Sequence, residues 1–214
     1  MEKLRHIYLP FRPSGGEKRL LFATEAVNLH TSVSVDSRFK GLPIPCNIVL
    51  SCPKIYKLRL HEEITELPED LMCLRNLTKL TLSGFGNLKD DHIKVLEKLS
   101  SLRMLFASVR IFQASLVCSE GGFPFLEFLY LYSLLEFKEW KVEKGAMPSL
   151  CRLHIEYSPD LEAVPDGLQY ITTLKELTIK GMLPKFCSGL GEGGEDFYKI
   201  QHFRNAKQSQ APER

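Results

Sequence analysis

The sequence predicts an α/β solenoid, a coil of stacked repeats, and two observations favour it. First, the apolar frame LxxLxL, clearest at 126–131, returns along the chain, with starts at residues 55, 77, 102, 126, 150 and 174. Second, the steps between successive starts are nearly constant, at 22, 25, 24, 24 and 24 residues. A frame this regular is typical of leucine-rich repeats, in which each repeat forms one turn of the coil.

The frame also explains why the repeats must stack. Its last two apolar positions lie two residues apart, which places them on one face of a strand. Each repeat buries about three or four leucine-class side chains, at about 1.5–3 kcal/mol each. Ordering the backbone costs about 1–2 kcal/mol per residue, so no repeat is stable alone. We therefore expect a curved right-handed coil of about eight repeats, with a parallel β-sheet on the concave side and short helices or irregular segments on the convex side.

One repeat near the N-terminus is degenerate. The frame fits residues 4–9, and the next clear start follows 51 residues later, which leaves room for a hidden repeat between them. In one frame Ser32 and Ser34 point inward; in a frame slipped by one residue, Val33 and Val35 do. A slip of one residue exchanges the two faces of a strand. We favour the slipped frame, because burying valine is better than burying serine.

These repeats divide the chain into a repeat domain at 1–188, a closing segment at 189–204 and a polar tail at 205–214 that we expect to be disordered. The predicted repeats start near residues 4, 29, 55, 77, 102, 126, 150 and 174. A solenoid needs polar caps on its end repeats, and the first frame would expose an apolar edge. We therefore expect either a fragment that lacks upstream residues or a cap formed by a partner chain.

Three stretches of the convex side carry signals of their own. An acidic start followed by apolar residues at helical spacing predicts a short helix at 90–99. Residues 107–122 interrupt the regular step and are interpreted as a loop with buried anchors. Trp140 falls on an outer arc, where we expect it in the core.

Composition excludes several classes of function. The net charge is only +2 with 25% charged residues, so nothing indicates binding to nucleic acid or to a membrane surface. No run of 18 apolar residues predicts a membrane span. The chain opens on a repeat strand and not on a signal peptide, so we expect a cytoplasmic location.

No arrangement of side chains predicts chemistry. The six cysteines form no CxxC pair, so we expect reduced thiols and no zinc site. No nucleophile, base and orienting group occur in a known spacing. We therefore expect no enzyme activity, no catalytic residue, no metal site and no cofactor.

A binding surface is predicted on the concave side, because residues between the inward leucines of each strand point outward. Basic residues cluster on the early coils and aromatic residues on the central ones, and aromatic residues are enriched in binding hot spots. Two alternatives stay open: the aromatic rings are covered by their own loops, or the basic residues are simply solvated. The predicted protein-binding residues are Tyr8, Lys57, Arg59, Lys79, Phe106, Phe128, Tyr130, Tyr132, Arg152, His154 and Tyr157.

Four segments resemble one family. They are ITELPEDLMCLRNLTKL at 64–80, FPFLEFL at 123–129, MPSLCRL at 147–153 and GEDFYKIQH at 194–202. They are similar to repeats and closing segments of plant intracellular disease-resistance receptors of the coiled-coil, NB-ARC, leucine-rich-repeat class (NLR proteins).

The resemblance implies a module of innate immunity that senses a pathogen effector, directly or through a guarded host protein, and holds the receptor inactive. In a full-length receptor its own NB-ARC module would be a further partner. This chain carries no nucleotide-binding module, so ATP or ADP binding is not implied for it. An alternative is an intracellular leucine-rich-repeat scaffold of the Ras-binding type, although its near-constant 23-residue step differs from the steps found here.

Overall fold

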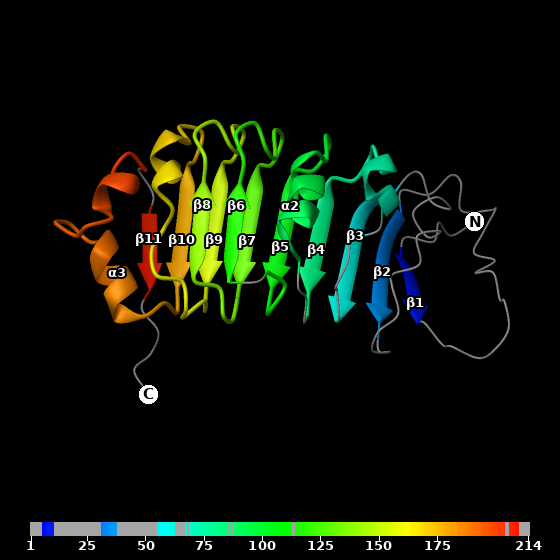
Figure 1. The fold of residues 1–214 in the computed structure, drawn as a ribbon, viewed down its shortest axis with the longest axis horizontal. Coiled ribbons are helices and arrows are strands. Elements are labelled where there is room, and N and C mark those ends of the chain that lie inside the picture. Colours follow the sequence, from blue (N-terminus) through cyan, green and yellow to red (C-terminus); the bar gives the residue numbers. More distant parts are fainter. Residues whose placement is uncertain are drawn as a thin grey trace, which may run out of the picture.

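The computed structural model describes residues 6–10, 31–37, 55–62, 67, 69–84, 86, 88–112, 114–203 and 206–209. These residues form an α/β solenoid in which parallel strands stand side by side, one from each coil (Figure 1). The strands are β1 (His6–Pro10), β2 (Thr31–Ser37), β3 (Ile55–Glu62), β4 (Lys79–Ser83), β5 (Met104–Ser108), β7 (Phe128–Tyr132), β9 (Arg152–Glu156), β10 (Glu176–Lys180) and β11 (Ala206–Ser209). They pair in that order in one nine-stranded sheet, which confirms the predicted architecture.

The strand register stacks the repeat frame into two buried columns. The first column joins residues that are direct Cα partners across successive strands: Leu58, Leu80, Leu105, Leu129, Leu153 and Leu177. The second column is built in the same way from Leu60, Leu82, Ala107, Leu131, Ile155 and Ile179. Every one of these side chains is at most 2% exposed, so the columns form the core of the solenoid.

The degenerate repeat follows the slipped frame. In the register of the first strands, Val33 is the Cα partner of both Ile7 and Leu58, and Val35 is the partner of Leu9 and Leu60. Only the slipped frame gives this alignment. The structure describes the backbone of β1 and β2 but not their side chains.

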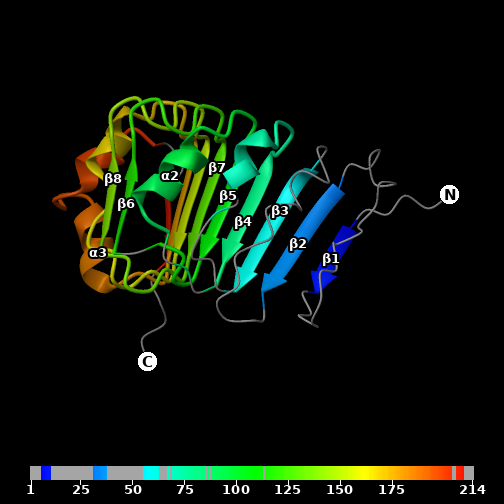
Figure 2. The ribbon, with the colours of Figure 1, turned by 45° about the vertical axis from the view of Figure 1, so that its right-hand side comes forward.

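Different elements close the convex side in successive coils (Figure 2). They are the 3-10 helix η2 (Glu69–Cys73), the helix α2 (Asp90–Glu97), the short strands β6 (Ser115–Cys118) and β8 (Glu139–Val142), and the 3-10 helix η3 (Asp166–Tyr170). Helix α2 confirms the predicted outer helix. Its aspartates lie in the first turn, where carboxylates interact favourably with the helix dipole. Its apolar residues Ile93 and Leu96 are buried.

The segment 107–122 is more ordered than the loop we expected. Its anchors Phe112 and Leu116 are buried, as predicted, but residues 115–118 form β6, which pairs with β8 in a second, two-stranded parallel sheet. Trp140 on β8 is in the core as expected, and its Nε1–H donates to Cys118 Sγ at 3.5 Å. A four-residue strand shows too little alternation of apolar and polar residues to be recognised in the sequence. Its partner lies one coil away, so the pairing has no local signal either.

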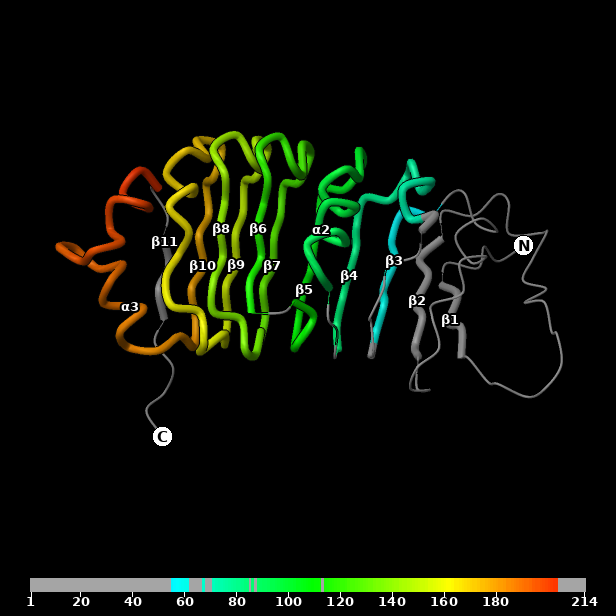
Figure 3. The backbone as a smooth tube through the Cα atoms, in the orientation of Figure 1, coloured from blue at the N-terminus to red at the C-terminus, as the bar shows by residue number. Residues whose placement is uncertain are grey.

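The C-terminal part closes the last coil, as the trace in Figure 3 shows. Helix α3 (Pro184–Leu190) and the 3-10 turn η4 (Phe197–Lys199) pack there, and Ile200 and Phe203 are buried. Residues 206–209 form β11, which pairs with β10; the other residues of the predicted tail lie outside the described ones. Without β11, the outer edge of β10 would expose a row of unpaired backbone groups, and β11 pairs with them.

Candidate protein-binding face

The concave face is built from residues that alternate with the buried columns. In β4 and β5, inward side chains are buried and outward ones are intermediate, the alternation of a half-covered strand. Because the strands are in register, the outward residues also line up from strand to strand. The middle row consists of Arg59, Thr81, Phe106, Tyr130, His154 and Thr178. The row at the strand entrances consists of Lys57, Lys79, Met104, Phe128, Arg152 and Glu176.

Three rings pack together at the centre of this face. The Phe106 ring meets Phe128 edge-on with centroids 5.3 Å apart, and Tyr130 in the same way at 5.7 Å. The Phe128 and Tyr130 rings lie nearly parallel, 6.3 Å apart. Edge-to-face packing is a favoured arrangement of aromatic pairs. All three side chains keep an intermediate exposure, so their mutual contacts cover them only in part.

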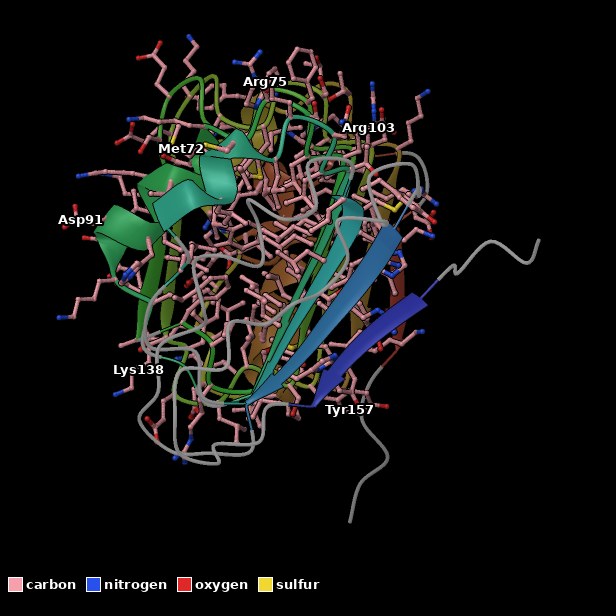
Figure 4. All side chains as sticks on the ribbon, turned by 90° about the vertical axis from the view of Figure 1, so that its right-hand side faces the viewer. Met72, Arg75, Asp91, Arg103, Lys138 and Tyr157 are labelled. Atoms are coloured by element: carbon pink, nitrogen blue, oxygen red, sulfur yellow. The ribbon has the colours of Figure 1, made fainter. Side chains whose placement is uncertain are left out.

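Two tyrosines extend this cluster to the exit end of the strands. The Tyr132 ring lies 5.8 Å from that of Tyr130 and 5.8 Å from that of Tyr157. Tyr132 is 41% exposed and Tyr157 is 46% exposed. In Figure 4 the labelled Tyr157 lies at the lower end of the sheet, away from the convex side. We call Phe106, Phe128, Tyr130, Tyr132 and Tyr157 the aromatic ladder.

The orientation of Tyr157 depends on the neighbouring coil. Its backbone is left-handed, with φ of 52°, and its N–H donates to Lys180 O at 2.9 Å. Its ring lies against Gly181: a Cβ at that glycine would come within 2.3 Å of Tyr157 Cδ1. Only glycine leaves room for this ring, so Gly181 fixes where the ladder ends.

Cations cover part of the ladder. Lys79 Nζ lies 4.3 Å from the centroid of Phe106, and the Arg152 guanidinium lies 4.9 Å from that of Phe128. Both distances are typical of cation–π contacts. His154 packs edge-on against Phe128, with centroids 4.9 Å apart. The predicted Arg152 and His154 therefore lie in the same cluster as the aromatic rings.

The basic residues on the early coils form a second group, which we call the basic cluster: Lys57, Arg59 and Lys79. Lys57 and Lys79 are direct Cα partners on β3 and β4. Burial lowers the pKa of Lys79, and the positive charges of Arg59 and Lys57 lower it further. The cluster therefore holds like charges close enough to repel one another.

One carboxylate that the predicted site does not include, Glu156, also interacts with the ladder. Glu156 is only 8% exposed and lies 3.4 Å from Lys180 Nζ. Burial, the charge of Glu156 and a hydrogen bond to it together raise the pKa of Tyr130 to about 12. In the sequence, Glu156 directly follows a repeat frame, at the position that pairs with Tyr132. That position alone indicated that Glu156 belongs to the concave face.

His154 is less well satisfied. Its Nε2 lies 3.3 Å from Glu176 Oε1, within ion-pair distance, yet the geometry gives this buried nitrogen no hydrogen bond. A well-aligned bond is needed for a sizeable contribution, so we regard the contact as a weak, mainly electrostatic one.

The structure thus brings ten of the predicted residues to one face, in the basic cluster and the aromatic ladder with Arg152 and His154. Tyr8 lies apart on β1, where only the backbone is described. Within the described ranges, no three His, Cys, Asp or Glu side chains come close enough to hold a metal ion. The same residues include no helix that is both long and apolar enough to cross a membrane.

Comparison with known proteins gives a consistent group of relatives. No protein-family model matches the chain. A probable disease resistance protein of Arabidopsis thaliana is 40% identical over 156 residues, which cover 72% of this chain and 18% of the relative. The Arabidopsis disease resistance protein RPP8 is 40% identical over 68% of this chain and 16% of its own length. The disease susceptibility protein LOV1, also from Arabidopsis, is 39% identical over 75% of this chain and 17% of its own length.

The matched part is thus less than a fifth of each of these relatives. The matches agree with the resemblance carried by the repeats and the closing segment, and the stacked coils supply the expected fold. The chain therefore belongs, as a leucine-rich-repeat region, to the plant disease resistance proteins.

Proposed function

We propose that the chain is the protein-recognition module of an intracellular plant immune receptor, and that it binds its partner on the concave face. The partner is a pathogen effector, a guarded host protein or the nucleotide-binding part of its own receptor. The module works in the cytoplasm by binding alone, without catalysis. One observation carries the proposal: the aromatic ladder runs along an open sheet with every ring partly exposed.

Partner binding gives a physical reason for exposed aromatic side chains on an open sheet. Apolar area that remains in water is unfavourable by about 25 cal/mol per Å², and a contiguous patch of it marks an interaction site. The ladder rings already have fixed neighbours, so binding would cost little side-chain entropy. Tyrosine adds a hydroxyl that can donate to a partner, which explains its enrichment in hot spots.

Site-specific photo-crosslinking tests the proposal. A photoreactive amino acid replaces Tyr132 in the 214-residue chain, which is expressed in plant cells and irradiated. Tyr132 is 41% exposed within the ladder, so we expect discrete crosslinked proteins. The same amino acid at Lys138, an exposed position on the convex side in Figure 4, is the control and should give none of these products.

A pair of double variants sharpens the test. Phe128→Ala with Tyr130→Ala should abolish the products from position 132. Met72→Ala with Tyr170→Ala removes two convex side chains that are 48% and 50% exposed, and it should leave the products unchanged. Circular dichroism checks that both variants fold. Equal crosslinking from positions 132 and 138, or full crosslinking without the two rings, would reject the concave face as the recognition surface.

A further inference from the structure

The concave face has a polarity along its length. The basic cluster lies on β3 and β4, which follow β2 in the strand order (Figure 1). The aromatic ladder begins on β5 and continues over β7 to the exit of β9. The carboxylates of Glu156 and Glu176 follow on β9 and β10. A partner that lies along this face meets positive charge on β3 and β4, then rings, then charges of both signs, because Arg152 and Lys180 are the Cα partners of Glu176 and Glu156.

The acidic and the basic residues of this face differ in their side-chain neighbours. Glu156 lies 3.4 Å from Lys180 Nζ, and Glu176 lies 3.3 Å from His154 Nε2. In the part of the chain that the structure describes, Lys57, Arg59 and Lys79 form no ion pair with a carboxylate.

Repulsion within the basic cluster favours an anionic partner. The lowered pKa of Lys79 reflects its burial and the charges of Arg59 and Lys57 beside it. A carboxylate placed among the three side chains would relieve this repulsion and form charge-assisted hydrogen bonds. Arg59 is exposed and can reach such a group, while Lys79 lies over Phe106 and joins the cluster to the ladder.

Resting on the proposed function, we propose that the partner presents an acidic protein segment whose carboxylates bind the basic cluster and whose apolar or aromatic side chain packs against Phe128 and Tyr130. The segment crosses the strands with its acidic part over β3 and β4. In the reverse orientation its carboxylates would lie over β9 and β10, where Glu156 and Glu176 offset the charges of Lys180 and Arg152, so the positive excess found on β3 and β4 is absent.

The strand order sets the spacing of these two features. Neighbouring strands lie about 4.8 Å apart, so β7 is about 10 Å from β4 and about 14 Å from β3. An extended peptide advances about 3.3 Å per residue. The apolar anchor therefore lies about three or four residues from the acidic residues in the partner.

Peptide selection tests this inference without a known partner. Phage-displayed random dodecapeptides are selected against the folded 214-residue chain. We expect enrichment of peptides with two or more Asp or Glu residues, separated by about three or four positions from Phe, Tyr, Trp or Leu. An enriched peptide is then synthesised with a fluorophore, and its affinity is measured by fluorescence anisotropy.

Paired variants assign the two features. Lys57→Gln with Lys79→Gln should weaken the peptide about tenfold, the loss expected for two partly exposed ion pairs, and should reduce the salt dependence of binding. Lys94→Gln with Lys138→Gln removes the same charge from exposed positions on the convex side and should change the affinity less than twofold. Phe128→Ala with Tyr130→Ala should remove binding.

The outcomes separate this inference from the proposed function. Peptides that need Phe128 and Tyr130 but contain no acidic excess would overturn the acidic partner and support recognition by the ladder. Peptides insensitive to both double variants would overturn both proposals. A selection that enriches no peptide with the expected spacing overturns the inference, whereas the crosslinking from position 132 still decides the proposed function.

Discussion

On the concave side, each strand from β3 to β10 repeats the one before it, whereas the convex side changes its element in almost every coil. The concave sheet buries every second residue in the same two columns and leaves most of the others partly exposed. On the convex side, different elements contribute the buried side chains of each coil, such as helix α2 in one coil and the paired strands β6 and β8 in the next ones. Outward residues of the sheet can therefore vary with little effect on stability, which suits a binding surface.

The connections between the two sides share one backbone device. After each of three successive strands, the second residue beyond the buried column is left-handed: Val109, Ser133 and Tyr157, with φ of 65°, 53° and 52°. Gly181 follows β10 at the same position with φ of 61°. This conformation is unfavourable for residues other than glycine. The fold tolerates it because the turn N–H groups donate to the next coil, as Ser133 does to Glu156 O at 2.8 Å.

The largest expected effect comes from the buried column. Leu153→Ala removes a side chain that is 0% exposed, and we expect a loss of about 2–5 kcal/mol in the free energy of unfolding. Arg152→Ala, one residue earlier on the exposed face, should change it by less than about 0.5 kcal/mol. Urea denaturation followed by circular dichroism measures both. Equal losses would show that the two faces of the strand do not differ as described.

On the convex side, Gly167 tests how tightly an outer element packs. A Cβ there would lie 2.0 Å from Val142 O, a backbone atom that cannot move freely. Gly167→Ala should destabilise the fold by about 1–3 kcal/mol. The control is Gly189→Ala in α3, where the nearest atom lies 3.5 Å away and alanine favours the helix. Thermal unfolding of both variants should give opposite shifts; a Gly167→Ala protein as stable as the original would contradict the close packing.

A smaller effect is expected where the closing segment meets η3. Lys199 Nζ lies 2.7 Å from Asp166 Oδ1 and 2.6 Å from Asp196 Oδ1, and it donates to Val164 O at 3.0 Å. Lys199→Met keeps the buried carbon chain and removes these contacts. We expect a loss of about 1–2 kcal/mol, because Asp166 stays hydrated.

Hydrogen exchange measures this loss locally. Amides of the closing segment at 197–203 should exchange faster in Lys199→Met, while those of β7 and β9 keep their protection. Lys175→Met, a change at an exposed lysine, is the matched control. Unchanged exchange at 197–203 would show that the apolar contacts of Ile200 and Phe203 hold the segment without Lys199.

The smallest effect concerns the hydroxyl of Tyr130. Its pKa is raised to about 12 in the folded chain, above the ordinary value of 10.0. The neutral hydroxyl is thus favoured by folding, and its contribution is complete below pH 10 and is lost as the pH rises through 12. Tyr130→Phe should remove this pH dependence, which we expect to be below about 1 kcal/mol because the ring is partly exposed. Urea midpoints of both proteins from pH 9 to 11.5 measure it; identical pH profiles would contradict the shift.

Much of the concave face could be predicted because its signals are local. The two-residue spacing of apolar positions predicted the strands, and their register follows once the frame is known. That register brought Phe106, Phe128 and Tyr130 together, as the columns of the sequence indicated. The surroundings of Tyr157 and Tyr130 could not be predicted, because they depend on Gly181 and Glu156 in neighbouring coils.

The sequence by itself determined the repeat, the buried columns and the set of residues that can face a partner, since these depend only on periodicity within about 24 residues. Only the tertiary structure decided the pairing of β6 with β8, the addition of β11 to the sheet and the ion pair between Lys199 and Asp166. Each of these joins residues at least one coil apart, or satisfies backbone groups that stacking leaves open. Such contacts have no period in the sequence, because they form only after the coils have stacked.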